Sequence, residues 1–395
     1  TTTLGELGLV CIQMSNRMIF NHKIILLLLL ALPLSAAGQQ IKIGNYTFSD
    51  GGEYQGELIK GKPYGHGTTT FPNGDTHTGE YVKGKRQGQG VYLFSDGEKY
   101  EGEWFQNQQH GRGTFYFANN NRYEGLWFRD FQQGQGTMYY FNGDIYVGNW
   151  EQDLRSGEGV YTYANGASYK GTWKADKRDG RGVFDWNNGN RYDGEWKDNM
   201  MDGQGTYTYA SGDTYKGTFK ADQQHGHGIY TFHDGCRYEG QYQNGKRTGE
   251  GIFTFPNGDR YVGHFEDGEQ SGMGTFTWKG GAVYEGQWKN DQQNGRGKYT
   301  WANGDVYDGE WKDGRMDGAG IMRQADGVKF KGTFKAGLKD GPGILEDSDG
   351  IRYEGTFREG QKDGEFTEKD RNGKLIRKVT YVHGLVQSVS EIAKE

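Results

Sequence analysis

The sequence predicts an all-β protein, an elongated and twisted antiparallel sheet built like a solenoid from tandem 23-residue β-hairpin repeats. Three observations lead to this class. An aromatic-x-Gly-x-aromatic pattern returns at one constant interval without an insertion. The chain of 395 residues holds 69 Gly, 27 Tyr, 21 Phe and 10 Trp but 5 Pro, a composition that fits neither collagen nor a disordered chain. Aromatic residues and glycines alternate with a period of two, which is typical of strands.

Residues 1–38 are interpreted as a signal peptide together with upstream sequence. Arg17 and Lys23 precede the apolar run 24–34, and small residues follow it. This run is shorter than the ~20 residues that a membrane-spanning helix needs. We therefore expect an exported protein of the periplasm, the cell envelope or the extracellular space. Without these residues Cys236 is the only cysteine, so we expect stability to come from packing and not from an internal disulfide.

The repeats divide the rest of the chain. Residues 39–53 form an N-terminal half repeat, residues 54–375 hold fourteen units, and residues 376–395 form a C-terminal cap or tail. Units are numbered from one to fourteen, and the opening residue of each unit is position zero. The fourteen opening residues are Tyr54, His77, Tyr100, Tyr123, Tyr146, Tyr169, Tyr192, Tyr215, Tyr238, Tyr261, Tyr284, Tyr307, Phe330 and Tyr353.

The sequence of each unit predicts two strands, around positions zero to four and thirteen to seventeen, followed by a turn to the next unit. A two-residue turn would place the two aromatic rows on opposite faces of the sheet. Pro72 and Pro256 at the first loop place, with Asn or Asp and then Gly, instead fit a three-residue turn closed by a left-handed Gly. This turn predicts cross-strand pairs such as Tyr92 with Tyr100, and places all the aromatic residues on one face.

Glycine at positions two and thirteen is expected to leave a slot in which a neighbouring ring lies over the backbone. Positions six to twelve are polar and variable. We expect them to form a loop, and this loop to be the part that partners contact.

Stretches such as YEGEWFQNQQHGRGTFYFANNNR, YDGEWKDNMMDGQGTYTYASGDT and YEGQWKNDQQNGRGKYTWANGDV resemble the MORN repeat (membrane occupation and recognition nexus) from residue 44 to about residue 375. The resemblance implies tandem β-hairpins in a long antiparallel sheet, with roles in membrane association, phospholipid binding, scaffolding and self-association. It implies no catalysis. The last units replace aromatic residues by polar ones, as the cap of a solenoid needs, and the end of the chain is expected to form a short helix or to fray.

The sequence predicts no catalytic, cofactor-binding or metal-binding residues. Segments 79–86 and 240–247 match the start of a GxxxxGK phosphate loop, but Ser or Thr does not follow the Lys and no helix is expected there. Segment 346–354 lacks the later acidic ligands of a calcium loop.

Two further groups of residues are candidates for metal ligands. His225 and His227 are separated from His233 by roughly 15 Å along an extended strand, too far for one zinc ion. The aspartates of the repeated turns could hold weakly bound ions, although solvated turns are the simpler interpretation; they are Asp75, Asp144, Asp213, Asp259 and Asp305.

The favoured hypothesis is a non-enzymatic exported scaffold that binds proteins or the membrane surface in the cell envelope, with self-association as a further property. The formal net charge of −6 argues against a nucleic-acid partner. The alternative is a glycan-binding envelope protein that stacks sugars on an aromatic ladder. Exposure of the following row would favour it: Trp104, Trp127, Trp150, Trp173 and Trp196. An accessory role beside a phosphoinositide kinase is the weakest alternative, since no kinase motif is present.

Overall fold

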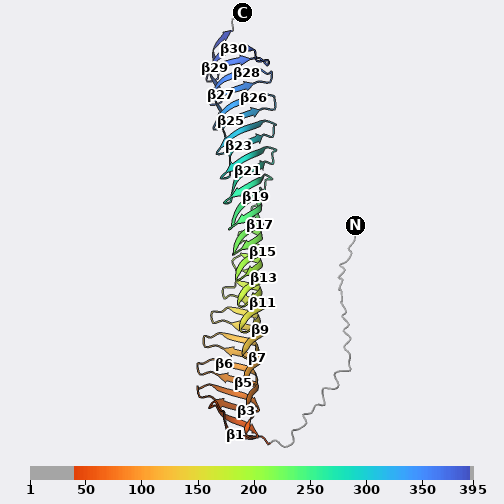
Figure 1. The fold of residues 1–395 in the computed structure, drawn as a ribbon, viewed down its shortest axis with the longest axis vertical. Helices are drawn as coiled ribbons and strands as arrows, with labels where there is room; N and C mark the ends of the chain where they lie inside the picture. Colours follow the sequence, from red (N-terminus) through yellow and green to blue (C-terminus); the bar gives the residue numbers. More distant parts are fainter. Residues whose placement is uncertain (1–39, 392–395) are drawn as a thin grey trace, which may run out of the picture.

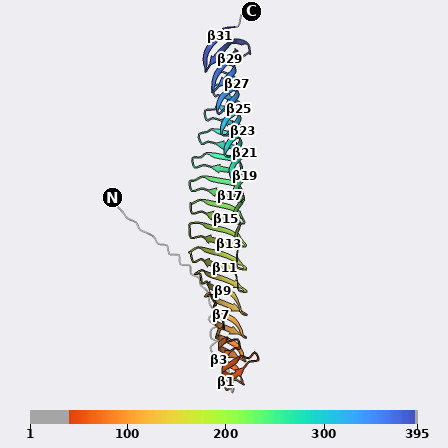
Figure 2. The same ribbon diagram turned by 90° about the vertical axis from the view of Figure 1, so that its left-hand side faces the viewer.

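A computed structural model describes residues 40–391, which form one open antiparallel sheet of 31 strands. Each strand pairs with the next strand along the chain, so the sheet extends as a long rod from β1 to β31 (Figure 1). The second view shows the same narrow rod from the side (Figure 2). The all-β prediction and the single long sheet are confirmed.

The strands follow a regular alternation of seven and nine residues through most of the rod. Their bounds are β1 Lys42–Thr47, β2 Glu53–Ile59, β3 Lys62–Thr70, β4 Thr76–Val82, β5 Lys85–Leu93, β6 Lys99–Phe105, β7 Gln108–Tyr116, β8 Arg122–Phe128, β9 Phe131–Tyr139, β10 Ile145–Glu151, β11 Leu154–Thr162, β12 Ser168–Lys174, β13 Lys177–Asp185, β14 Arg191–Lys197, β15 Met200–Thr208, β16 Thr214–Lys220, β17 Gln223–Thr231, β18 Arg237–Gln243, β19 Lys246–Thr254, β20 Arg260–Glu266, β21 Glu269–Thr277, β22 Val283–Lys289, β23 Gln292–Thr300, β24 Val306–Lys312, β25 Arg315–Arg323, β26 Lys329–Lys335, β27 Leu338–Glu346, β28 Arg352–Arg358, β29 Gln361–Lys369, β30 Leu375–Val382 and β31 Leu385–Glu391.

The turn between units has the predicted three-residue form. The Phe94 N–H donates to the Glu98 carbonyl at 2.9 Å, and the Gly97 N–H donates to the Phe94 carbonyl at 3.0 Å. Gly97 has a φ of +94°, as the left-handed closing residue requires. Tyr92 lies opposite Tyr100 as a result. The predicted register is confirmed, and all the aromatic rows share one face.

The second turn of each unit differs from the expected loop at positions six to twelve. It contains only two residues, for example Gln106 with a φ of +50° and Asn107 with a φ of +77°, the signature of a type I′ turn. Strand β7 begins directly afterwards at Gln108. The predicted loop over positions six to twelve was therefore wrong, because these positions form a two-residue tip and the first part of a strand. That partners contact this region stays a prediction.

The aromatic face of the sheet is buried within a single chain. The Tyr100 ring covers Gly113, where an added Cβ would overlap it, and its hydroxyl donates to the Glu103 carbonyl at 2.9 Å. Arg86, near the start of β5, also lies against this face, with its guanidinium 4.3 Å from the Trp104 ring and 5.9 Å from the Phe71 ring. The expected slot over glycine is present, and arginine side chains such as Arg86 and Arg155 cover part of the aromatic rows.

The last units change the pattern at the C-terminal end. Phe366 replaces a glycine, is fully buried, and its ring covers Gly355. Glu368 is also buried and accepts from Arg377 at 2.6 Å. The segment 388–391 lies in strand β31, so the expected short helix is not formed there, and residues 392–395 lie outside the described part.

Residues 1–39 also lie outside the described part, so the predicted signal peptide has no structural counterpart here. Between residues 40 and 391, no helix has the length and apolar character needed to cross a membrane.

Candidate functional site: a groove over the glycine row

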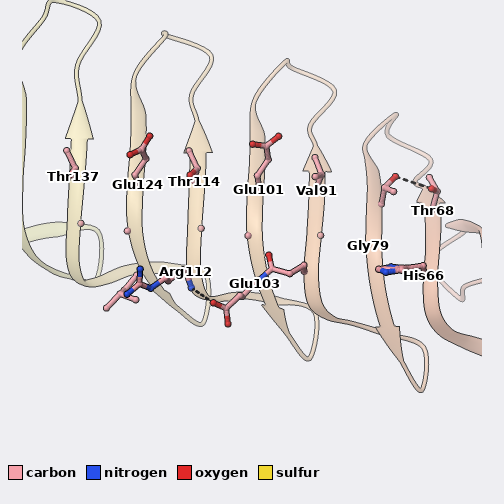
Figure 3. A pocket seen from close by; sticks show the side chains of 18 of the residues that line it. His66, Thr68, Gly79, Val91, Glu101, Glu103, Arg112, Thr114, Glu124 and Thr137 are labelled. Atoms are coloured by element: carbon pink, nitrogen blue, oxygen red, sulfur yellow. Dashed lines mark hydrogen bonds between the residues drawn. The ribbon is translucent and has the colours of Figure 1, made fainter.

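A long surface groove with a volume of about 1260 Å³ runs across the strands of units one to five (Figure 3). It lies on the face opposite the aromatic rows, and glycines from positions two and thirteen form its floor. The residues that line it are Gln55, Gly56, His66, Gly67, Thr68, Thr78, Gly79, Gln89, Gly90, Val91, Glu101, Gly102, Glu103, Arg112, Gly113, Thr114, Glu124, Gly125, Leu126, Gln135, Gly136, Thr137 and Val147.

The glycines line up because the register is regular. Gly102 lies opposite Gly113, and Gly113 lies opposite Gly125 in the next unit. An added Cβ at Gly102 would overlap the Cα of Gly113, so the two backbones approach more closely than side chains allow. The result is a continuous strip of bare backbone, with side chains of positions one and fourteen on one side and positions three and twelve on the other (Figure 3).

Carboxylates of position three are held in place by a β-bulge. The bulge residue Gly111 has a φ of +62°, and the Glu103 carboxylate lies directly over it. Glu103 Oε1 accepts the Arg112 N–H at 3.0 Å, and Glu80 accepts the Gln89 N–H at 3.2 Å in the preceding unit. These bonds fix each carboxylate at the edge of the groove.

Carboxylates of position one are partly neutralised. Glu101 pairs with Lys99 at 2.7 Å, and Glu124 pairs with Arg122 at 2.9 Å. Each of these cations also lies over a tyrosine ring, Lys99 at 4.2 Å from Tyr116. By contrast, Glu80 and Glu103 form no ion pair with any residue between 40 and 391. Arg112, which lines the groove at position twelve, forms no ion pair with any residue between 40 and 391 either, so the groove carries unpaired charge of both signs.

The tryptophan row that would mark a sugar platform faces away from this groove and is buried. The indole N–H of Trp127 donates to the Gly113 carbonyl at 3.2 Å, and that of Trp196 donates to the Gly182 carbonyl at 3.0 Å. All five rings of the row are 4–6% exposed. Their arrangement is that of a packed core, which favours the scaffold over the glycan interpretation.

The two GxxxxGK segments lie in β-hairpins. Gly79 lies in β4 opposite Gly90, Lys83 and Gly84 form the tip, and Lys85 begins β5. Segment 240–247 repeats this arrangement in β18 and β19. The backbone N–H groups of these strands belong to the sheet, so the segments do not form a phosphate-binding loop.

The three candidate histidines lie in separate settings. His225 and His227 are on β17, whereas His233 lies in the following turn, where its Nδ1 is 3.0 Å from the Asp213 carboxylate. A backbone N–H from His233 also donates to Asp213 and is the main cause that lowers the pKa of this carboxyl to about 2.

The repeated turn aspartates link neighbouring units. Asp144 accepts the Tyr161 hydroxyl at 2.7 Å and the Ala164 N–H at 2.8 Å, both from the next unit. Burial raises the pKa of Asp144, but these hydrogen bonds outweigh it and the pKa is lowered. Asp75, Asp213, Asp259 and Asp305 accept equivalent backbone N–H groups. The turn aspartates therefore hold neighbouring units of the sheet together.

The calcium-like segment 346–354 is also a turn. Asp347 accepts the N–H groups of Asp349 and Ile351 at 3.1 and 2.9 Å, and Tyr353 donates to its second oxygen. Among residues 40–391, no group of three or more His, Cys, Asp or Glu side chains is arranged to hold a metal ion.

These features define an elongated β-hairpin repeat protein with a surface groove along its glycine row. The model of the MORN repeat matches fourteen consecutive segments, from 54–76 to 353–365. The chain therefore belongs to the MORN-repeat family. A search of curated proteins gives no match to this sequence.

Comparison with solved structures gives distant likenesses. The TCP domain of SAS-4 from Drosophila melanogaster, solved with a proline-rich motif of Ana2, is 18% identical with a TM-score of 0.26, covering 40% of this chain and 85% of that one. The TCP10 domain of CPAP from Danio rerio, solved with a STIL peptide, is 14% identical with a TM-score of 0.25, covering 69% and 94%. Virginiamycin B lyase from Staphylococcus aureus is 11% identical with a TM-score of 0.13, covering 79% and 97%. Likenesses at these scores carry no information on function.

Proposed function

We propose that this protein is a non-enzymatic scaffold that binds other proteins along the groove over its glycine row. The groove is the observation that carries the proposal. It runs across several units, and its lining mixes carboxylates, threonines and aliphatic side chains on a rigid backbone strip. Such a surface suits an elongated polypeptide, because equivalent contacts recur at every unit and add through effective concentration.

A protein partner is favoured over a lipid surface by charge. Anionic lipid headgroups are attracted by clustered Lys and Arg, whereas the groove lining holds a single such residue, Arg112, beside the carboxylates of Glu101, Glu103 and Glu124. Burial of the tryptophan row likewise argues against the glycan alternative. The proposal includes no reaction, since the candidate motifs of the sequence lie in hairpins and turns that hold the sheet together.

We also propose that the chain is exported and works in the cell envelope, the periplasm or the extracellular space. The support is the basic and then apolar sequence of residues 1–38. Cell fractionation followed by N-terminal sequencing tests it. A mature N-terminus near residue 39 in an exported fraction is expected, and a cytosolic chain that retains residues 1–38 would contradict it.

Binding can be tested by selecting peptides from a random display library against residues 39–395, with co-sedimentation on anionic vesicles, neutral vesicles and cell-wall glycan in parallel. We expect selected peptides that protect the groove strands from amide hydrogen exchange. Binding to vesicles alone, falling with salt, would replace the proposal by a membrane-surface role. Binding to glycan with a change in tryptophan fluorescence would replace it by the glycan alternative.

A further inference from the structure

A small cavity lies on the aromatic face of the sheet at the N-terminal end of the rod. Its volume is about 90 Å³, the space of about three water molecules. The half repeat and units one to three all contribute to its lining, which consists of Phe48, Asp50, Thr69, Phe71, Tyr81, Gly84, Arg86 and Asn107. A ligand held there would contact several successive repeats at once.

The cavity follows from one residue that departs from the repeat. Position fifteen holds a large side chain in units two to fourteen: Tyr92, Phe115, Met138, Tyr161, Phe184, Tyr207, Tyr230, Phe253, Phe276, Tyr299, Met322, Leu345 and Glu368. Unit one has Thr69 at this position. Because a threonine side chain is much smaller, it leaves space on the aromatic face that a ring fills in most other units.

Two fully buried hydroxyl groups line the cavity and share one hydrogen bond. Thr69 is 0% exposed and Tyr81 is 2% exposed, and their hydroxyl oxygens lie 2.5 Å apart. Each hydroxyl carries one proton, so only one of the two donates in this bond. Between residues 40 and 391 the other hydroxyl has no acceptor. A buried donor without an acceptor is unfavourable, so a group that accepts a hydrogen bond is expected in the cavity.

The Arg86 guanidinium also lines the cavity, and it has no carboxylate partner. It lies over the Trp104 ring at 4.3 Å and donates to the Asn107 carbonyl at 2.8 Å. At the same position in unit five, Arg155 pairs with Asp176 at 2.9 Å. Asn107 replaces this aspartate beside Arg86, which forms no ion pair within the described part of the chain. Burial lowers the pKa of Arg86, and an anion beside the guanidinium would offset this effect.

The charges around the cavity favour a ligand with a single carboxylate. The planar guanidinium of Arg86 matches the two oxygens of a carboxylate. Asp50 is exposed, lines the same cavity and accepts the Gly52 N–H at 3.0 Å. Its negative charge opposes a second negative charge on the ligand, as in phosphate or a dicarboxylate, and attracts an ammonium group.

We propose that this cavity binds a small monocarboxylate, either a simple acid of the size of acetate or an α-amino acid of the size of glycine. The carboxylate pairs with Arg86 and accepts a hydrogen bond from the Thr69 and Tyr81 hydroxyl pair. Asp50 holds the ammonium group where the ligand has one. The site does not depend on the proposed scaffold function, because the groove lies on the opposite face of the sheet.

Isothermal titration calorimetry of the full chain tests the site in a buffer free of carboxylates and phosphate. The probes are acetate, glycine, glycinamide, which keeps the ammonium group but has no carboxylate, and inorganic phosphate. We expect acetate or glycine to bind at least tenfold more tightly than glycinamide and phosphate. Absence of binding by both carboxylates, or equal affinity for glycinamide or phosphate, would overturn the inference, and the cavity would then hold water alone.

Asp50→Asn distinguishes the two classes of monocarboxylate. A tenfold loss of glycine affinity with unchanged acetate affinity assigns the site to an α-amino acid. Unchanged or tighter binding of both ligands assigns it to a simple acid, since Asp50 then contributes only repulsion.

Two further variants introduce residues that the repeat already carries, so the fold should persist. Thr69→Phe places a ring at position fifteen, as in units three, six, nine and ten, and fills the cavity. Arg86→Gln introduces the residue found at position nine in units three, four, eight, ten and eleven. We expect at least tenfold weaker binding in each variant, and circular dichroism checks that both retain their strands.

Arg178→Gln is the matched control for Arg86→Gln. Arg178 donates to the Asn199 carbonyl at 2.7 Å and lies over the Trp196 ring at 4.3 Å, as Arg86 does with its own partners. Phe184 fills position fifteen in this unit, so the affinity should not change. An equal loss of affinity in the two glutamine variants, or full binding by Thr69→Phe, would overturn the inference.

Bound ligand should also stabilise the N-terminal end of the rod. At a ligand concentration of ten times Kd, amides of β1 to β6 that exchange through opening of this end should exchange about elevenfold more slowly. Amides of units eight to fourteen should be unaffected, and protection spread evenly over the rod would contradict the location of the site. None of these results bears on the groove, so the scaffold function is tested separately by the peptide selection.

Discussion

Tyrosine at position zero and glycine at position thirteen act as one structural element. The Tyr100 ring is fully buried because Gly113 has no side chain beneath it, and the hydroxyl reaches the Glu103 carbonyl because the ring lies flat along the strand. Burial raises the pKa of the Tyr100 hydroxyl, which keeps it protonated as a donor. Repeated at unit after unit, this pair builds the core on one face and the bare groove floor on the other.

Gly113→Val should destabilise units three and four by about 3 kcal/mol, because the branched side chain overlaps the Tyr100 ring. Amide hydrogen exchange resolved by unit is the suitable measurement, since a long repeat array need not unfold in two states. Thr114→Val, one residue further on the groove face, is the control, and Val91 and Val160 already occupy this position in other units. Equal protection in both variants would show that the ring does not need the glycine.

His77 replaces tyrosine at position zero in unit two, and this replacement predicts a pH dependence. It is fully buried, and neither ring nitrogen has a hydrogen-bond partner within the described residues. Burial, and next the charge of Arg86, lowers its pKa to about 3. The unfolded chain binds a proton below pH ~6.5 while the folded chain does not, so stability falls as the pH drops, by about 2 kcal/mol at pH 5.

His77→Tyr should therefore raise the hydrogen-exchange protection of units one to three relative to the unchanged chain. The increase should be larger at pH 5 than at pH 7. The control is His66→Gln, on the groove face of unit one. In this variant the loss of hydrogen-exchange protection between pH 7 and pH 5 should equal the loss in the unchanged chain. A His77→Tyr chain that loses as much protection as the unchanged chain on acidification would contradict the assignment to His77.

The hairpin is the element that transmits order along the rod, and its tip is tied to the preceding unit. Asp153 lies in a type I′ tip with a φ of +67°. Its carboxylate accepts the Gln132 N–H at 2.7 Å, and its own N–H donates to the Gln132 carbonyl at 3.2 Å. Asn107 and Asn199 make the same contact in other units, to Arg86 and Arg178.

Asp153→Ala should lower the stability of the contact between units four and five by about 1–2 kcal/mol. The Gln132 N–H loses its acceptor, and alanine tolerates the left-handed backbone conformation of this position less well than aspartate. Asp153→Asn keeps both properties and should be nearly neutral. Hydrogen exchange of the Gln132 amide is the direct measurement. An alanine variant with unchanged exchange at this amide would show that the tip contact does not hold the units together.

Much of the hairpin was predictable, and the part that was missed has a physical cause. Proline, Asn and Gly at the inter-unit turn predicted the register, since only one turn length places these residues where their backbone angles belong. The tip was misjudged because its polar side chains suggest a loop. Pairs such as Asn244-Gly245 and Asp313-Gly314 carry the type I′ signal and could have identified it. The groove depends on glycine alignment across strands, which follows only once both turns are known.

At the scale of the whole molecule, length should be proportional to the number of units. Thirty strand spacings of ~4.8 Å give a sheet roughly 145 Å long. Because each strand of the described part pairs through hydrogen bonds only with its neighbours along the chain, four internal units, residues 192–283, can be removed in register. Small-angle X-ray scattering should then show a maximum dimension shorter by about 38 Å, the span of the eight strands removed, with the N-terminal groove intact. An unchanged dimension, or a chain that no longer forms the rod, would contradict the linear assembly.

The orientation of the strands also determines how the rod responds to force. Each strand runs across the long axis, so the hydrogen bonds of the ladder lie along it. Tension between the two ends therefore loads the bonds of one strand pair at a time, as in opening a zipper, and the rod should extend hairpin by hairpin at low force. Lateral loads are instead shared by the whole ladder. A protein of this build can hold two partners at a set distance, yet it releases chain length smoothly when they are pulled apart.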